Sequence, residues 1–271
     1  MKSRRVHNIT TLGIPDLQVY RTLRRPVDHI DQGIFVADGE KVVRRLIASG
    51  LDVLSFLLTP EWDGTLRGTE PRYEQISADI YLGPKELLSE IVGYRMHQGI
   101  MAVAKVPPEP DRESIGSGER PFIVALDGLM NAENVGVVVR NCAGFGVDAI
   151  LVGETSSSPY LRRAVRNSMG TVFRVPVCHS GNLADDLAVL KRRGIPVIGT
   201  DPEGSAPIGR VSWERGCCLI LGSEESGLRQ PVRDACDLFV SIPMENQTDS
   251  LNVSSASAVL LYEVARQRRS P

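Results

Sequence analysis

Short apolar runs alternate with amphipathic segments along the N-terminal part of the chain. Apolar runs of this length are typical of buried strands, and apolar residues spaced three and four apart are typical of helices that cover a sheet. In this interpretation Gly50 closes the first helix and Pro84 begins the second. The pattern predicts a small α/β sandwich, with strands at 33–38, 52–59, 78–83 and 99–106 and helices at 39–50 and 84–93.

The same alternation returns in the C-terminal part with more strongly apolar strands. Near-continuous apolar strands between helices predict a parallel sheet covered on both faces. Asn134 is a candidate N-cap for the first helix, and Gly194 closes the second. The predicted strands lie at 122–126, 147–153, 171–177, 195–200, 217–222 and 238–244, and the predicted helices at 135–143, 183–193 and from Val253 onward.

A segment rich in proline, glycine and alternating charge separates the two parts. Such composition is typical of a linker between compact units. We therefore predict an N-terminal domain at residues 1–106, a linker at 107–120 and a C-terminal domain at 121–271.

Composition narrows the class of protein only slightly. The chain has 271 residues, 42% of them hydrophobic, and a formal net charge of -2, so it is expected to be globular and shows no global sign of a polyanionic partner. Local arginine clusters can still bind phosphate, although each one alone is more typical of a solvated helix face. These clusters lie at 4–5, 24–25, 44–45, 162–166, 192–193 and 266–269.

Other residue types argue against secretion, membrane insertion and metal binding. The five cysteines form no C-x-x-C pair and mostly lie in apolar runs, which indicates buried, reduced thiols. No apolar segment follows the basic N-terminus, and no stretch is long enough to cross a bilayer. The four histidines are scattered, so no metal is expected. The sequence predicts a cytoplasmic protein.

The stretch "GFGVDA" at residues 144–149 matches the dinucleotide fingerprint G-x-G-x-x-[GA]. That fingerprint requires a strand before it and a helix after it, so that helix N–H groups face the pyrophosphate. Here a predicted helix precedes the glycines and a predicted strand follows them. The glycines are better interpreted as closing a helix, and a dinucleotide-dependent enzyme is disfavoured.

Three other loops follow predicted strands, where open α/β sheets bind their ligands. The first contains Asn134, Gly136 and Arg140, and the second is "LGSEESGL" at 221–228. The third, at 244–252, carries more Asn, Gln, Ser, Thr and Asp residues than one helix cap requires. We interpret this excess as a loop that binds a ligand through main-chain groups and presents side chains to a substrate.

Taken together, N-x-G-x-x-x-R (134–140), G-S-E-x-x-G (222–227) and I-P-M-x(5)-S-L-N-V-S (242–254) resemble the three motifs of the SpoU, or TrmH-type, RNA ribose 2'-O-methyltransferases of the SPOUT superfamily. The segment 157–177 is similar to the S-P-x-x-x-R-x-S-M-G segment of that family. Asn246 stands where many members have Gly, in a pattern similar to that of antibiotic-resistance members.

The resemblance implies an α/β C-terminal domain with a parallel sheet and a C-terminal trefoil knot. It also implies a smaller N-terminal α/β substrate-binding domain similar to RNA-binding ribosomal proteins. The methyl donor would be S-adenosylmethionine, the usual assembly a homodimer, and the substrate a structured RNA, with rRNA favoured over tRNA. Residues carried over as cofactor-binding are Thr200, Leu221, Gly222, Ile242, Met244 and Leu251.

The family's essential arginine corresponds to Arg140. A guanidinium is not normally deprotonated, so we expect Arg140 to bind the RNA phosphate beside the target ribose rather than to act as a base. The other residues carried over are Asn134, Glu224, Ser250 and Asn252 in the catalytic site, and Arg166 and Ser168 as substrate contacts.

Two alternatives within the same fold stay open at this point. One is a non-catalytic RNA-binding protein, which the joint presence of the catalytic-site residues disfavours. The other is an enzyme that methylates a base nitrogen, which the pairing of N-x-G-x-x-x-R with S-L-N disfavours.

Overall fold

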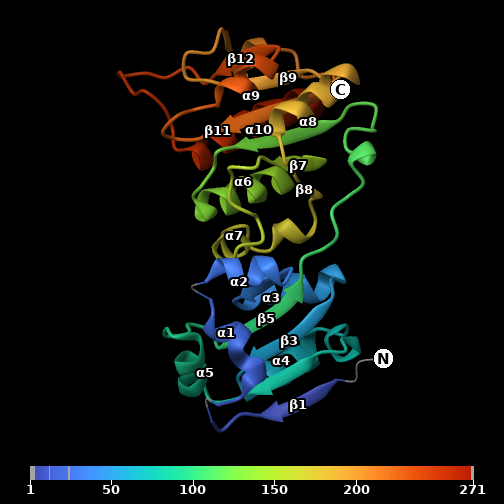
Figure 1. The fold of residues 1–271 in the computed structure, drawn as a ribbon, viewed down its shortest axis with the longest axis vertical. Coiled ribbons are helices and arrows are strands. Elements are labelled where there is room, and N and C mark those ends of the chain that lie inside the picture. Colours follow the sequence, from blue (N-terminus) through green and yellow to red (C-terminus); the bar gives the residue numbers. More distant parts are fainter. Residues whose placement is uncertain (1–3, 12, 24, 270–271) are drawn as a thin grey trace. The chain divides into compact units, whose positions relative to one another are not determined.

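The computed structural model describes residues 4–11, 13–23 and 25–269. These residues form two compact units (Figure 1). The first unit contains the chain up to Pro108 together with Tyr160–Phe173, and the second contains Glu109–Pro159 and the chain from Arg174 onward. The chain thus leaves the second unit once to add a segment to the first, which the sequence-based boundaries did not anticipate.

The first unit is built on a five-stranded sheet in the order β1-β4-β3-β5-β2. Strands β1, β4 and β3 are parallel, and β5 runs antiparallel to both β3 and β2. The strands are β1 (Arg5–Asn8), β2 (Ile34–Asp38), β3 (Val53–Leu58), β4 (Asp79–Leu82) and β5 (Ile100–Lys105). The helices are α1 (Gln18–Arg21), α2 (Pro26–Asp31), α3 (Glu40–Ser49), α4 (Pro60–Thr69), α5 (Lys85–Val92) and α7 (Arg162–Asn167).

All four strands and both helices predicted for this part are present. Gly50 ends α3 in the left-handed region at φ 78°, as predicted. The strand β1 and the helices α1, α2, α4 and α7 of this unit were not predicted. The segment of α4 contains two glycines, and its apolar residues are few. Pro60 in its first turn and the burial of Leu66 nevertheless support the helix.

The second unit is built on a seven-stranded, entirely parallel sheet in the order β10-β12-β9-β11-β6-β7-β8. The strands are β6 (Phe122–Asp127), β7 (Ala149–Val152), β8 (Val177–His179), β9 (Val197–Thr200), β10 (Ala206–Pro207), β11 (Cys217–Gly222) and β12 (Leu238–Ser241). The helices are α6 (Ala132–Phe145), α8 (Leu183–Arg192), α9 (Gln230–Ala235) and α10 (Val253–Arg269). This confirms the predicted parallel α/β architecture.

Helices cover both faces of this sheet. Leu183 and Leu187 of α8 and Val232 of α9 share one core cluster with Ile123 of β6 and Ile220 of β11. Helix α10 packs against α6 and also contacts β11 (Figure 1). Burial on both faces explains why these strands are apolar at nearly every position.

Two local predictions for the C-terminal part need correction, and the closure of a helix by glycine is confirmed at Gly146. The N-cap of α6 is Asn131, whose side chain accepts hydrogen bonds from the N–H groups of Glu133 (2.8 Å) and Asn134 (3.3 Å), so Asn134 lies inside the first turn. Gly146 closes α6 at φ 78°, whereas Gly144 lies within the helix. Residues 171–177 are not extended throughout, because a 3-10 turn at Thr171–Phe173 precedes β8.

The predicted linker packs against the second unit from Glu109 onward. Ile115 is 5% exposed and belongs to the core cluster of the sheet. Arg112 pairs with Asp186 of α8 at 2.7 Å. This segment is therefore an ordered part of the second unit rather than a free tether.

The five cysteines are free, and all but Cys236 are buried. Burial raises the pKa of the Cys217 thiol to about 12. Among the described residues, no helix is both long and apolar enough to cross a membrane.

Candidate functional site

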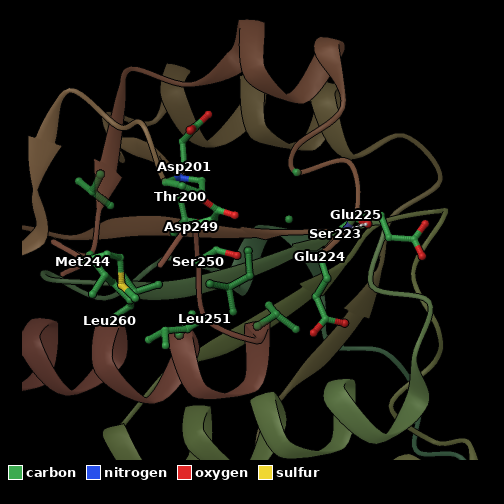
Figure 2. Close-up of a pocket in the computed structure, with 18 residues that line it drawn as sticks. Thr200, Asp201, Ser223, Glu224, Glu225, Met244, Asp249, Ser250, Leu251 and Leu260 are labelled. Carbon is green, nitrogen blue, oxygen red and sulfur yellow. Dashed lines mark hydrogen bonds between the residues drawn. The ribbon is translucent and has the colours of Figure 1, made fainter. Parts of the chain in front are cut away.

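A cavity of about 260 Å³ opens at the carboxyl ends of β9, β11 and β12, where a parallel sheet is expected to bind a ligand (Figure 2). It is lined by residues from the ends of these strands, from the loops that follow them and from the first two turns of α10. The structure places six predicted cofactor residues in this lining: Thr200, Leu221, Gly222, Ile242, Met244 and Leu251. Ser250 and Glu224 line it as well.

The ionisable side chains that line the cavity are acidic, and one of them, Asp201, is paired with Arg233 at 2.5 Å. The ionisable residues in the lining are Asp201, Glu224, Glu225 and Asp249, and no Lys, Arg or His among the described residues lines it. Much of the remaining lining is apolar, including Val240 and Leu260, which the sequence did not single out. An acidic rim around an apolar pocket favours a ligand with an apolar body and a positive centre, and it disfavours a pyrophosphate.

The loop after β11 has little room for side chains. Ser223 and Gly227 exchange two backbone hydrogen bonds of 3.0 Å, which close the loop into a tight turn. Gly227 adopts φ 65°, and a Cβ atom on Gly222 would lie 2.7 Å from the carbonyl carbon of Gly227. The main chain is therefore the surface that a ligand meets on this side of the cavity.

The polar loop between β12 and α10 contains two consecutive residues in the left-handed region. Asn246 has φ 56° and Gln247 has φ 57°. Asn tolerates this conformation better than most residues, and Gly adopts it freely. This backbone requirement explains why Asn can stand at a position where glycine is common in the similar sequences.

Glu224 connects this loop to α6. Its Oε2 accepts a hydrogen bond of 2.7 Å from Asn134 Nδ2, and its Oε1 accepts one from Asn252 Nδ2. The Oδ1 atom of Asn252 also accepts the backbone N–H of Ser254 at 2.9 Å, which caps the start of α10. Three predicted site residues from distant parts of the chain thus form one hydrogen-bonded group beside the cavity.

Arg140 lies on α6 beyond this group, with an exposed side chain. Within the described part of the chain it has no hydrogen bond or ion pair. A guanidinium in this state can bind an incoming anion without first breaking an internal contact. The structure does not bring Arg140 into contact with Glu224.

Arg166 and Ser168 belong to the first unit rather than to the group around the cavity. The Arg166 side chain is 52% exposed, lies 3.5 Å from Asp38, and borders a separate cavity of about 420 Å³. Ser168 is completely buried, and its hydroxyl donates to the Val165 carbonyl at 2.8 Å and accepts from the Gly170 N–H at 3.1 Å. These bonds form the turn after α7, so the predicted substrate contact of Ser168 is not supported.

Sequence reasoning missed Asn141, which holds the start of α10 against α6. Its Nδ2 donates to the Ser254 carbonyl at 3.0 Å and to the Ser257 hydroxyl at 2.8 Å. The signal was a partly buried amide beside Cys142 on the apolar side of α6, because a polar group shielded from water requires partners.

Residues 121–262 match the SpoU rRNA Methylase family. The chain is 33% identical over 261 residues to an uncharacterized tRNA/rRNA methyltransferase of Mycobacterium bovis, covering 93% of this chain and 89% of that relative. It is 34% identical over 253 residues to another protein of that description from Mycobacterium leprae, covering 90% of this chain and 81% of the relative.

Solved structures of similar fold cover nearly the whole chain. The SpoU methyltransferase AviRb from Streptomyces viridochromogenes matches with a TM-score of 0.81 and 25% identity, covering 94% of this chain and 98% of that one. An RNA 2'-O ribose methyltransferase matches with a TM-score of 0.78 and 26% identity, covering 97% of this chain and 99% of that one. An AdoMet-bound rRNA methyltransferase from Sinorhizobium meliloti, 22% identical with a TM-score of 0.84 over 98% and 99%, supports the fold alone.

Proposed function

Because the chain belongs to the SpoU rRNA methylase family of the SPOUT superfamily, we propose that it transfers a methyl group from S-adenosylmethionine to a ribose 2'-hydroxyl of a structured RNA. The observation that carries this proposal is the bridge from Glu224 to Asn134 and Asn252, beside a cavity lined by the residues expected to hold the cofactor. Support for the ribose as acceptor also comes from the similar RNA 2'-O ribose methyltransferase.

The cavity suits S-adenosylmethionine on three grounds. Ile242, Leu251 and Leu260 give the adenine an apolar wall. The closed loop at 222–227 presents main chain, which can recognise the adenosine by hydrogen bonds. The acidic rim favours the positive sulfonium, whereas a dinucleotide would bring phosphates against the same carboxylates.

Bound S-adenosylmethionine supplies an electrophilic methyl group, so the tasks left to the protein are orientation and removal of one proton. Holding two reactants in line can contribute roughly 7–11 kcal/mol to lowering the barrier. We assign orientation of the ribose to Asn134, Ser250 and Asn252. Glu224 fixes the two amides through the hydrogen bonds described above.

Arg140 would bind the RNA phosphate next to the target ribose and stabilise the negative charge that develops on the 2'-oxygen. Its exposed position without an internal partner among the described residues supports this role. The hydroxyl proton would pass to that phosphate or to water, because the guanidinium has no acceptor atom.

RNA recognition is assigned to the first unit, with rRNA as the favoured substrate over tRNA. Arg166 is the one predicted substrate contact that stays accessible, and Lys41 lines the same cavity of that unit. Structured RNA is recognised mainly by shape, phosphates and exposed loops, for which such cationic side chains are suited.

The proposal includes a homodimer and a knot. On α10, Val259 is 42% exposed and Tyr262 is 57% exposed, and the Tyr262 ring contacts Phe145 of α6 at 6.1 Å between centroids. A second copy of the chain would cover this apolar face. The trefoil knot is included because the chain belongs to the SpoU family, and it stays a prediction.

The test is methyl transfer from labelled S-adenosylmethionine to unmodified total RNA, with the wild type and Arg140→Ala side by side. The expected result is label on ribose in one RNA size class with the wild type and its loss with the variant. Label on a base would favour the alternative SPOUT enzyme. If the protein transfers no methyl group and does not bind S-adenosylmethionine, the proposal is overturned in favour of a non-catalytic RNA-binding protein.

A further inference from the structure

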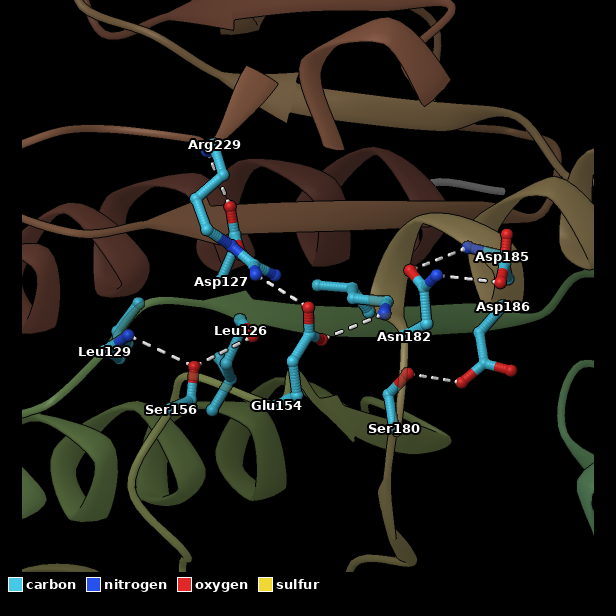
Figure 3. A network of polar contacts seen from close by, with 11 residues as sticks. Leu126, Asp127, Leu129, Glu154, Ser156, Ser180, Asn182, Asp185, Asp186 and Arg229 are labelled. Atoms are coloured by element: carbon cyan, nitrogen blue, oxygen red, sulfur yellow. Dashed lines mark hydrogen bonds and ion pairs between the residues drawn. The ribbon is translucent and has the colours of Figure 1, made fainter. Parts of the chain in front are cut away.

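A buried ion pair lies at the carboxyl ends of the central strands of the second unit. Asp127, the last residue of β6, is 0% exposed. Both of its carboxylate oxygens accept hydrogen bonds from Arg229: Oδ1 from the guanidinium Nε at 2.6 Å and Oδ2 from the backbone N–H at 2.8 Å (Figure 3). Main chain and side chain of one arginine are therefore fixed on one carboxylate, which restricts both the position and the direction of the chain at residue 229.

The same guanidinium extends the connection to the next strand. Its Nη1 donates to Glu154 Oε1 at 2.6 Å, and Glu154 Oε2 accepts the N–H of Leu183, the first residue of α8, at 3.0 Å (Figure 3). Strands β11, β6 and β7 are neighbours in the sheet. The segments that follow these strands and the start of α8 are thus joined through one side chain.

This clamp, defined as Asp127, Arg229 and Glu154, adjoins the loop that carries Glu224. The loop leaves β11 at Gly222, closes through the Ser223–Gly227 hydrogen bonds and reaches Arg229 two residues later. Strand β11 therefore fixes one end of the loop and the clamp fixes the other. With both ends fixed, the Glu224 side chain extends toward Asn134 and Asn252.

We propose that Arg229 is a positioning residue for methyl transfer: by pairing with Asp127 it holds the 223–228 loop so that Glu224 orients the two asparagine amides. This inference rests on the proposed function. A guanidinium is required because a lysine cannot occupy Asp127 and Glu154 together in this planar geometry. Arg229 is not expected to touch RNA or cofactor, and its effect on the reaction passes through Glu224.

The test compares Arg229→Lys with a matched control, Arg112→Lys. Arg112 likewise joins two acceptors, the Asp186 carboxylate at 2.7 Å and the His179 carbonyl at 2.8 Å. It is not attached to the 223–228 loop, and like Arg229 it does not line the cofactor cavity. At saturating S-adenosylmethionine, Arg229→Lys should lower the single-turnover transfer rate by about 10- to 100-fold, and Arg112→Lys by less than about twofold. Equal effects of the two substitutions would overturn the proposal.

A double-variant cycle separates positioning from general stabilisation. If Arg229 acts through Glu224, its replacement has little effect once the Glu224 carboxylate is gone. The double variant Glu224→Ala/Arg229→Lys should therefore be less than about threefold slower than Glu224→Ala alone. A rate loss in the double variant equal to the product of the two single-variant losses would overturn the proposal. If Arg229→Lys fails to fold, as judged by its thermal melt, Asp127→Asn takes its place in the cycle because it keeps the shape of the side chain.

Hydrogen exchange keeps the inference testable if the wild type transfers no methyl group to any RNA. That outcome would contradict the proposed function, but it would leave the clamp open to measurement. In Arg229→Lys, the amides of Ser223 and Gly227 should exchange on the order of tenfold faster than in the wild type, with no change in the amides of α6. Unchanged exchange at both amides would show that the clamp does not hold the loop.

Discussion

Replacing Gly222 by Ala tests whether the closed loop forms the cofactor site. A methyl group at this position would lie 2.7 Å from the carbonyl carbon of Gly227, 2.9 Å from its oxygen and 2.9 Å from Leu228 Cδ2. The contact with backbone cannot be relieved by a rotamer change, since Gly227 is held by its paired hydrogen bonds to Ser223. The loop must shift, and its shift changes the wall that the ligand meets.

The expected loss of affinity follows from the size of this conflict. Inserting a methyl group into a packed site costs about 1–3 kcal/mol. If the strain is expressed as loop displacement, binding of S-adenosylmethionine should weaken by about 5- to 150-fold, because about 1.4 kcal/mol corresponds to a factor of ten. The rest of the sheet is unaffected, so the melting temperature should fall by only a few degrees.

Titration calorimetry with S-adenosylmethionine measures the affinity, and a thermal melt checks the fold. Gly144→Ala is the matched control, because a Cβ atom there meets nothing within 4 Å. It should bind S-adenosylmethionine like the wild type. Wild-type affinity in Gly222→Ala would refute the assignment of the loop to the cofactor. If Gly222→Ala melts much earlier, Leu251→Glu replaces it, since Leu251 lines the cavity and is 36% exposed.

Three further predictions concern the phosphate contact of Arg140, the ion pair of Arg229 with Glu154, and the exposed face of α10. Arg140→Lys should lower methyl transfer roughly 100-fold with unchanged cofactor affinity, and near-normal turnover would contradict a bidentate phosphate contact. The Arg229 guanidinium lowers the pKa of Glu154 to about 2, against an ordinary value of about 4.3. The pair therefore stabilises the fold fully above about pH 4.5, and this contribution is lost as the pH falls toward about 2. Acid titration of Glu154→Gln should show a shallower loss of stability in that range than the wild type, and equal slopes would exclude a contribution from the pair. Tyr262→Asp should sediment as a monomer, whereas Val6→Asp, at a residue of the first unit that is 48% exposed, should not change the assembly.

Hydrophobic periodicity predicted most of the sheet-forming segments because buried strands need apolar residues on both faces. β6, β9 and β11 follow directly from their sequence. β1 does not, because it is an edge strand with largely exposed residues, and its position depends on pairing with β4. The two-residue β10 is likewise defined only by its pairing with β12.

Helix starts were less predictable because several residues compete for one role. Both Asn131 and Asn134 can cap a helix, and nothing local decides between them. The structure selects Asn131, which releases the Asn134 side chain to bind Glu224. Tertiary contacts also determine to which unit residues 160–173 belong. They are continuous in sequence with the second unit but are part of the first.

The hydrogen bonds of Glu224 determine which atoms of Asn134 and Asn252 face it, and the sequence alone does not give this orientation. A carboxylate only accepts hydrogen bonds, so both asparagines must turn their Nδ2 atoms toward it. The Oδ1 atom of Asn252 then accepts both the N–H and the hydroxyl of Ser254, which occupy its two lone pairs. The Oδ1 atom of Asn134 has no donor among the described residues, so of the two amides it is the one able to accept the hydrogen bond of a ribose hydroxyl. Replacing either asparagine by Asp would set two carboxylates against each other, but only at Asn134 is the atom that accepts from the ribose disturbed as well. Asn134 is therefore expected to be the more sensitive of the two positions for the rate of transfer.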